Sequence, residues 1–182
     1  QTLMSRAELV AMTDGLAAER VQGAAAEIVN TVERMALQID ELLKLSRVGD
    51  RLGALVPVSV AEVISLATHD LGERMRLSGA KIELIHPVPM AMGNGPLLQE
   101  LFQNLLENSI KYGGADGPRI RVEAAPAPEG SVAVAIEDDG GGVPEAERDR
   151  IFGLFKRMSA HHKLEGVGAG LAIVRRITEV HG

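Results

Sequence analysis

Apolar and small residues recur at alternating spacings of four and three between residues 21 and 42. The positions are Val21, Ala25, Ile28, Val32, Met35, Ile39 and Leu42. Residues at these spacings form one stripe along a helix, and the charged residues Glu33, Arg34 and Glu41 lie off that stripe. The pattern predicts a bundle helix whose apolar stripe is covered by another helix.

A shorter apolar helix is predicted over residues 3–12, and Thr13, Asp14 and Gly15 predict a turn between the two helices. Residues 1–50 are therefore expected to form a helical hairpin. Two helices of unequal length bury little apolar surface by themselves, so the hairpin is expected to form a homodimer, as a four-helix bundle, or to bind a partner protein. The alternative is a helix that packs on a neighbouring globular domain.

The helical pattern changes near residue 50, and Gly53 and Pro57 mark the start of a second domain over residues 51–182. Its pattern predicts helices over residues 60–75, 96–112 and 168–180 and strands over residues 82–85, 119–123 and 132–137. The last two strands are expected to pair as a hairpin. This order predicts an α+β fold, in which a mixed sheet is covered on one face by helices in an α/β sandwich.

Composition and charge exclude several classes of function. Lys and Arg number 19 against 25 Asp and Glu, and the formal net charge of -6 disfavours a nonspecific nucleic-acid binder. The chain has no cysteine, which removes disulfides, thiolate zinc sites and cysteine nucleophiles. No uncharged apolar stretch approaches the roughly 20 residues of a membrane span. We expect a cytoplasmic segment without membrane contact.

Candidate chemistry begins on the helix predicted over residues 96–112. Asn104, Asn108 and Lys111 lie at positions i, i+4 and i+7, which places them in one row beside the apolar stripe. Amide oxygens can bind a hard cation and an ammonium can hold phosphate oxygens. The alternative is an ordinary solvated helix face.

Asp138 ends an apolar strand and is followed closely by Gly140, Gly141 and Gly142. Consecutive glycines are typical of chain that turns tightly or approaches a ligand. A carboxylate at this strand end can accept the amino group of adenine, and the mismatch with guanine would cost ~1–3 kcal/mol. The alternative is calcium binding by Asp138 and Asp139, but the further ligands of a calcium loop are missing.

Gly166, Gly168, Gly170 and Leu171 open the last predicted helix. Glycines at a helix N-terminus let backbone amides approach an anion, and the helix dipole adds to the attraction. Phosphate is therefore the expected ligand. The spacing fits neither a nicotinamide-cofactor fingerprint nor a P-loop.

In their order along the chain, these motifs resemble the sensor histidine kinases, within the superfamily that also holds gyrase, Hsp90 and MutL. Asn104-Leu-Leu-Glu-Asn108-Ser-Ile-Lys111-Tyr112 resembles the N box, and residues 138–144 resemble the first glycine box. Residues 151–157 resemble the F box, and residues 166–171 the second glycine box. The resemblance covers roughly residues 42–182.

The resemblance implies an ATP-binding catalytic domain. It assigns adenine recognition to Asp138, magnesium binding to Asn104 and Asn108, and contact with the nucleotide to Lys111 and Tyr112. Gly140, Gly142, Gly166, Gly168, Gly170 and Leu171 would complete the site, under a lid over residues 145–165. Two departures are Asp139, where the family usually has Asn, and Ala169, where a bulkier residue is common; both are expected to weaken nucleotide binding.

The resemblance also implies phosphoryl transfer rather than hydrolysis. ATPase members of the superfamily have a water-activating glutamate where this chain has Asn104, and an amide does not accept a proton near neutral pH. The phosphate would pass to a histidine and then to a response regulator. The alternatives are a nucleotide-binding pseudokinase scaffold that signals by contacts and an ATPase.

None of the histidines lies in the predicted hairpin; they are His69, His86, His161, His162 and His181. The resemblance therefore implies an acceptor histidine upstream of Gln1. It also implies that the catalytic domain continues beyond Gly182.

Overall fold

The computed structural model describes residues 2–85, 87–156 and 168–182. The chain divides into two compact units, residues 1–40 and residues 41–182. None of the helices in the described part of the chain is long and apolar enough to cross a membrane.

Helix α1 (Thr2–Arg51) replaces the predicted hairpin with one helix of 50 residues. The helix runs through Thr13, Asp14 and Gly15, so the turn predicted there is wrong. A single glycine inside a helix costs only about 1 kcal/mol, and the chain has no proline before Pro57 that would force a break.

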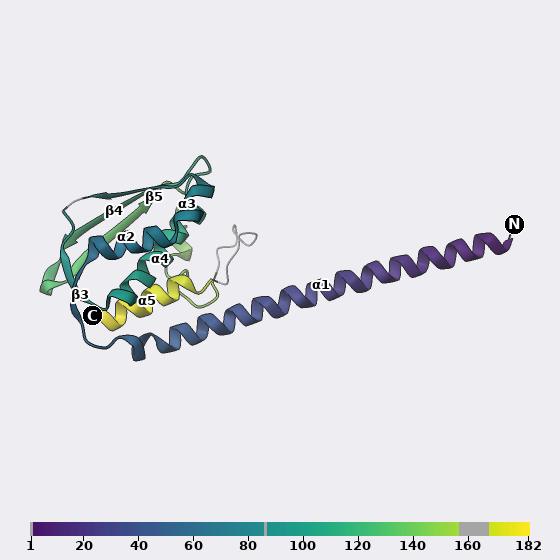
Figure 1. The fold of residues 1–182 in the computed structure, drawn as a ribbon, viewed down its shortest axis with the longest axis horizontal. Helices are drawn as coiled ribbons and strands as arrows, with labels where there is room; N and C mark the ends of the chain where they lie inside the picture. Colours follow the sequence, from purple (N-terminus) through teal and green to yellow (C-terminus); the bar gives the residue numbers. More distant parts are fainter. Residues whose placement is uncertain (1, 86, 157–167) are drawn as a thin grey trace. The chain divides into compact units, whose positions relative to one another are not determined.

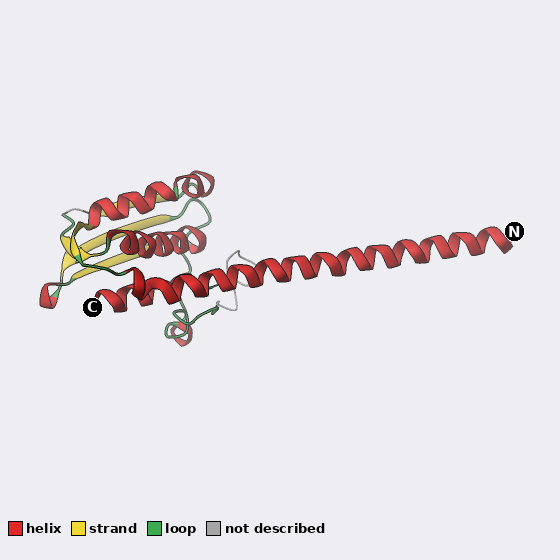
Figure 2. Ribbon diagram, turned by 60° about the horizontal axis from the view of Figure 1, so that its bottom comes forward, coloured by secondary structure: helices red, strands yellow, loops and turns green. Residues whose placement is uncertain are grey.

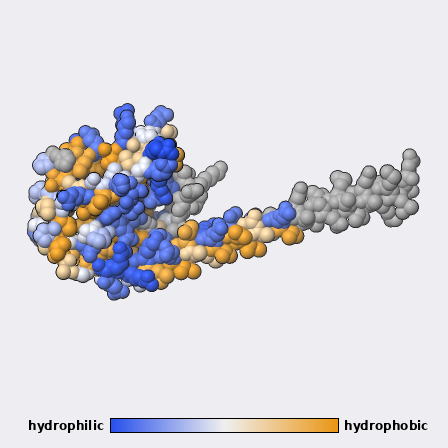
Figure 3. Space-filling view, in the orientation of Figure 1, coloured by the Kyte–Doolittle hydropathy of each residue, from blue (hydrophilic) through white to orange (hydrophobic). Residues whose placement is uncertain are grey.

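The heptad stripe is exposed within the first unit. Val21 is 69% exposed, Ile28 64%, Val32 58% and Ile39 58%. Figure 3 shows hydrophobic side chains along this stretch of α1. An apolar stripe of this kind is typical of a helix that packs against other helices, and the predicted dimerisation through residues 1–50 stays a prediction.

The second unit contains a three-stranded mixed sheet (Figure 1). Strand β2 (Lys81–Ile85) pairs in parallel with β4 (Arg119–Pro126), which pairs antiparallel with β5 (Val132–Asp138). The predicted hairpin of the last two strands is confirmed. On β4, Ile120 and Val122 are buried, whereas Arg119, Arg121 and Glu123 are exposed. This alternation gives the sheet one apolar face and one charged face.

Helices cover the apolar face of the sheet (Figure 2). They are α2 (Val60–Asp70), α3 (Gly72–Ser78), α4 (Gly95–Tyr112) and α5 (Gly170–His181). The predicted α+β class is confirmed. The helix predicted over residues 60–75 is broken between α2 and α3, where Leu71 ends one helix and Gly72 begins the next.

Strands β1 (Val56–Ser59) and β3 (Met90–Gly93) form a separate antiparallel pair that the sequence pattern did not predict. Each strand has only four residues, and β1 contains Pro57. Short strands with proline lack the alternation on which strand prediction depends.

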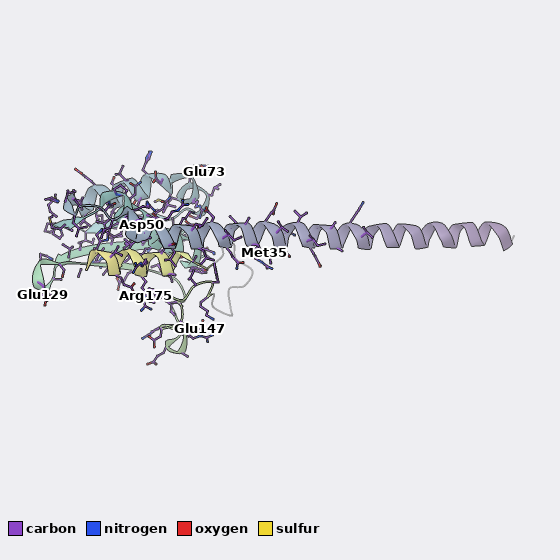
Figure 4. All side chains as sticks on the ribbon, turned by 90° about the horizontal axis from the view of Figure 1, so that it is seen from below. Met35, Asp50, Glu73, Glu129, Glu147 and Arg175 are labelled. Carbon is purple, nitrogen blue, oxygen red and sulfur yellow. The ribbon has the colours of Figure 1, made fainter. Side chains whose placement is uncertain are left out.

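The core of the second unit lies between α2, α4, α5 and the sheet. Leu97, Leu106 and Ile177 are fully buried there, together with Val48 from the last turns of α1. The second compact unit begins at Glu41, within the last turns of α1. The exposed side of α5 carries Arg175, whose Nε lies 2.9 Å from Oε1 of Glu179 (Figure 4).

Leu106→Ala should lower the free energy of unfolding of the second unit by about 2–5 kcal/mol, because Leu106 is fully buried at the centre of α4. Urea unfolding followed by the fluorescence of Tyr112, the single tyrosine, measures it. Leu77→Ala is the control. Leu77 is 70% exposed, so its truncation should change the free energy by no more than about 0.5 kcal/mol. Equal effects of the two substitutions would contradict the described core.

Candidate functional site

Helix α4 carries the predicted polar row. Its N-terminus is capped by Asn94, whose Oδ1 accepts a hydrogen bond from the backbone N of Leu97 at 3.0 Å. Leu97, Leu101 and Leu106 bury one side of the helix. Asn104, Asn108 and Lys111 are half-buried on the neighbouring side, so the helix presents these polar groups at the edge of the core.

Asn94 also ties the start of α4 to two other helices. Its Nδ2 donates to the backbone oxygen of Leu52 at 2.8 Å, just beyond α1, and its backbone N donates to Nε2 of His181 at 3.0 Å. His181 Nδ1 lies 2.8 Å from the oxygen of Ile177 within α5. The sequence analysis gave no role to Asn94 or His181, although an Asn directly before Gly-Pro is a recognisable capping signal.

Asn104 meets the beginning of α5. Its Nδ2 donates to the backbone oxygen of Glu100 at 2.8 Å. A Cβ atom added to Gly170 would lie 2.6 Å from Asn104 Oδ1, so a larger residue at 170 would require the Asn104 amide to shift. Two predicted site residues from separate motifs are therefore close neighbours.

The N-terminus of α5 is suited to an anion. Its cap residue, Ala169, makes no side-chain cap hydrogen bond, and the first turn holds no acidic residue. By contrast, Ser59 and Asn94 cap α2 and α4 with side-chain oxygens. Gly168 has a φ of 77°, which favours glycine. The first amides of α5 can therefore donate to a ligand. Leu171 lies in this turn, and Gly166 lies outside the described residues.

The end of β5 approaches the end of α4. Asp138 is exposed there, and its Oδ1 accepts a hydrogen bond from the backbone N of Gly140 at 3.0 Å. A Cβ atom added to Gly140 would lie 2.2 Å from the backbone oxygen of Tyr112. Glycine is thus required by a close approach at 140. At Gly142, in contrast, the surroundings are open and the φ of 69° favours glycine.

Lys111 and Tyr112 form the last turn of α4 beside this strand end. The Lys111 Nζ lies 5.0 Å from the centre of the Tyr112 ring, within the range of a cation–π interaction. This contact holds the Lys111 ammonium over the Tyr112 ring, in the turn of α4 whose backbone meets Gly140.

Asp139 has a structural role that the sequence analysis missed. Its Oδ1 accepts hydrogen bonds from the backbone N of Gly114 at 2.8 Å and from the backbone N of Arg119 at 3.1 Å. The Gly114 bond, followed by the Arg119 bond, lowers the pKa of the Asp139 carboxyl below its usual value. Asp139 therefore fixes the loop between α4 and β4 to the end of β5.

The described residues contain no group of three or more His, Asp or Glu side chains that could hold a metal ion. A cation at Asn104 and Asn108 would therefore depend on their amide oxygens and on oxygens supplied by phosphate and water, which magnesium commonly keeps as ligands. Asp138 and Asp139 each bond backbone amides of a different segment, an arrangement that does not favour the alternative of a shared calcium ion.

A cavity of about 520 Å³ borders Asn104 on the side of the last turns of α1. Its walls include Lys44, Arg51 and Glu107. Arg51 Nη1 lies 2.8 Å from Oε2 of Glu100, so an ion pair crosses from the end of α1 to α4 at this cavity. Asn104 therefore lies between the N-terminus of α5 and this open cavity.

The predicted lid falls partly outside the described residues. Residues 157–167 are not described, and they include His161, His162 and Lys163. The described part holds a short 3-10 helix, Glu145–Glu147, and the F-box residue Phe152, which is 38% exposed.

Residues 93–182 match the family model described as "Histidine kinase-, DNA gyrase B-, and HSP90-like ATPase". The chain is 38% identical over 156 residues to the methanogenesis regulatory histidine kinase FilI of Methanothrix harundinacea, covering 83% of the chain and 17% of FilI. It is 33% identical over 153 residues to the phytochrome-like protein Cph1 of Synechocystis sp., covering 84% of the chain and 20% of that protein. The chain thus spans about a fifth of the length of these relatives.

Solved structures agree with this match. The mycobacterial sensor histidine kinase MprB has a TM-score of 0.60 and 28% identity, covering 70% of this chain and 80% of that one. Full-length ShkA in complex with AMPPNP has a TM-score of 0.65 and 24% identity, covering 81% of this chain and 31% of that one, and shows the shared fold. Together, the family match and the likenesses in sequence and fold support a sensor histidine kinase ATP-binding core in this chain.

Gly140→Ala should lower the free energy of unfolding by about 1–3 kcal/mol, because the new Cβ would overlap the backbone oxygen of Tyr112. Gly141→Ala is a matched control, since a Cβ there meets nothing within 4 Å and should change the free energy by no more than about 0.5 kcal/mol. Urea unfolding of both variants measures the difference. A Gly140 variant as stable as the Gly141 variant would contradict the close approach.

Proposed function

We propose that this core binds Mg-ATP and transfers the terminal phosphate to a histidine of a helical bundle, other than the five histidines of this chain, from which a response regulator receives it. Asp138 accepts the amino group of adenine, and Lys111 and Tyr112 line the nucleotide. The glycines of both boxes and Leu171 surround the nucleotide with backbone groups and close contacts. They are Gly140, Gly142, Gly166, Gly168, Gly170 and Leu171. Asn104 and Asn108 hold the magnesium ion.

The observation that carries this proposal is the contact between Asn104 and Gly170. The amide oxygen of Asn104 lies directly against a helix N-terminus that no described side chain caps. Phosphate oxygens at the α5 amides would be within reach of a cation held by Asn104, because the two groups are neighbours. The likeness in fold to ShkA, solved with AMPPNP, supports the same assignment.

The base end of the site has a different chemistry. Asp138 is exposed at the strand end beside the last turn of α4. Its carboxylate can only accept hydrogen bonds at neutral pH, which suits the amino group of adenine and not the oxygen of guanine. A mismatch that leaves polar groups unpaired costs about 1–3 kcal/mol, so the site would prefer ATP to GTP by about tenfold to a hundredfold.

Magnesium fits the residues present. Two amide oxygens at positions i and i+4 of α4 offer neutral, hard ligands, and the remaining ligands would come from phosphate and water. When bound, the ion neutralises negative charge on the phosphates. The chain's own residues position the ion and the triphosphate, and they hold the adenine at the other end of α4.

Transfer to a histidine requires no strong base at position 104. A neutral imidazole nitrogen attacks the γ-phosphorus, a nitrogen–phosphorus bond forms, and the bond to the β–γ bridging oxygen breaks. ADP leaves with the electron pair, and the imidazole loses its other ring proton to solvent. Asn104 cannot activate water as a carboxylate would, and this favours transfer over hydrolysis.

Asp138→Asn should weaken the binding of Mg-ATP by about tenfold to a hundredfold, because hydrogen bonds to charged groups contribute about 1.5–3 kcal/mol. Isothermal titration calorimetry with ATP and magnesium measures the dissociation constant. Glu137→Gln is the matched control. It removes the same charge from the neighbouring exposed residue of β5 and should leave the affinity within about threefold. Undetectable ATP binding by the unsubstituted chain would refute the proposed function.

The chain alone should release inorganic phosphate from Mg-ATP at a rate no higher than the background, because Asn104 offers no base for water. A coupled phosphate assay measures this rate. The full-length protein, given ATP labelled at the γ-phosphate, should instead acquire an acid-labile and alkali-stable label. Steady phosphate release from the chain would favour an ATPase, and bound ATP without any label on the full-length protein would favour a pseudokinase scaffold.

A further inference from the structure

Two adjacent carboxylates at the end of β5 bond to different parts of the chain. Asp138 Oδ1 bonds the backbone N of Gly140, two residues further along its own segment. Asp139 Oδ1 reaches instead to the loop between α4 and β4, where it accepts from the backbone N of Gly114 and of Arg119. Neighbouring residues of the same charge therefore have separate structural roles.

The two bonds of Asp139 hold both ends of that loop. Gly114 is the second residue after α4, and Arg119 is the first residue of β4. A single oxygen atom thus joins the exit of the helix, the entry of the next strand and the end of β5. A Cβ on Gly114 would lie 3.0 Å from Asp139 Oδ2, so the carboxylate fits closely against the loop backbone.

This anchor lies beside the proposed adenine end of the site. Tyr112 precedes Gly114 by two residues, and its backbone oxygen touches Gly140, the residue after Asp139. The separation between Asp138 on β5 and the Lys111–Tyr112 turn on α4 is therefore fixed by two adjacent contacts. One is the steric contact at Gly140, and the other is the pair of hydrogen bonds from Asp139.

The bonding of Asp139 requires an oxygen acceptor and does not require a charge. Both partners are neutral backbone N–H groups, and an amide oxygen can accept the same two bonds. The expectation that Asp139 weakens nucleotide binding rests on the negative charge that it adds near the site. The structure places the acceptor oxygen on the loop amides.

We propose that Asp139 is a positioning residue for adenine recognition: by holding the exit of α4 against the end of β5 with one oxygen, it sets the geometry between Asp138 and the Tyr112 turn. This inference rests on the proposed function, since it concerns the same nucleotide site. Asp139 acts through Asp138 and Tyr112 and does not itself touch the nucleotide.

Three substitutions in the full chain separate geometry from charge, with dissociation constants for Mg-ATP and Mg-GTP measured by calorimetry. Asp139→Asn keeps the acceptor and removes the charge, and it should bind ATP within about threefold of the parent. Asp139→Ala removes the acceptor, and it should weaken ATP binding about tenfold and reduce the preference for ATP over GTP. Asp139→Glu keeps the charge but displaces the acceptor by one methylene, and it should resemble the Ala variant.

If the Ala variant loses its preference for ATP over GTP, Asp139 positions the adenine site and does not merely stabilise the fold. ATP affinity retained by the Asn variant would support the same conclusion. Circular dichroism and urea unfolding establish that each variant is folded; if the Ala variant does not fold, the comparison of Asn with Glu decides. Two outcomes would overturn the inference while the proposed function stands. One is equal ATP affinity in all three variants, and the other is an ATP affinity that the Glu variant keeps and the Asn variant loses. If the parent chain itself binds no ATP, the proposed function fails and the inference fails with it.

Discussion

The close approach of the end of β5 to the end of α4 is the constraint on which the candidate site depends. Gly140 leaves no space for a side chain against the backbone oxygen of Tyr112, and Asp139 bonds the loop that follows α4. Three consecutive residues therefore have three functions: Asp138 keeps an exposed carboxylate, Asp139 anchors the neighbouring loop, and Gly140 permits the contact. These three roles explain why a glycine directly follows Asp138 and Asp139 at the end of β5.

Helix α4 relates the two ends of the site to each other. Its last turn meets β5 at Tyr112, and its middle meets the beginning of α5 at Asn104. Eight residues separate these positions, which corresponds to about 12 Å along a helix axis. Leu97, Leu101 and Leu106 fix the helix in the core, so this separation is set by packing. A rigid spacing of that size suits a ligand with different chemistry at its two ends, as in an extended nucleoside triphosphate.

The sequence predicted those parts of the structure that repeat or that carry distinctive residue types. The helical period of α4 and the alternation in β4 and β5 were sufficient to predict the main helix and the hairpin. The Asn104 row and the glycine-rich start of α5 were also predicted to lie in one site, and the structure brings Asn104 next to Gly170. The turn at residues 13–15 was wrong because a lone glycine is a weak helix breaker. Strands β1 and β3 were missed because their pairing is long-range and each is too short to show a period. The role of Asp139 was missed for a similar reason: its partners lie 20 and 25 residues away, and residue type alone does not reveal them.

The amide at position 104 limits the chemistry that the proposed site can perform. Because Asn104 cannot accept a proton from water, the proposed chemistry depends on a nucleophile that another part of the protein brings to the phosphate. Separately, the exposed stripe of Val21, Ile28, Val32 and Ile39 favours association with another helix, since covering each of these side chains would contribute about 1.5–3 kcal/mol. In the proposed function, association of helices is the step that would bring an acceptor histidine to the bound nucleotide.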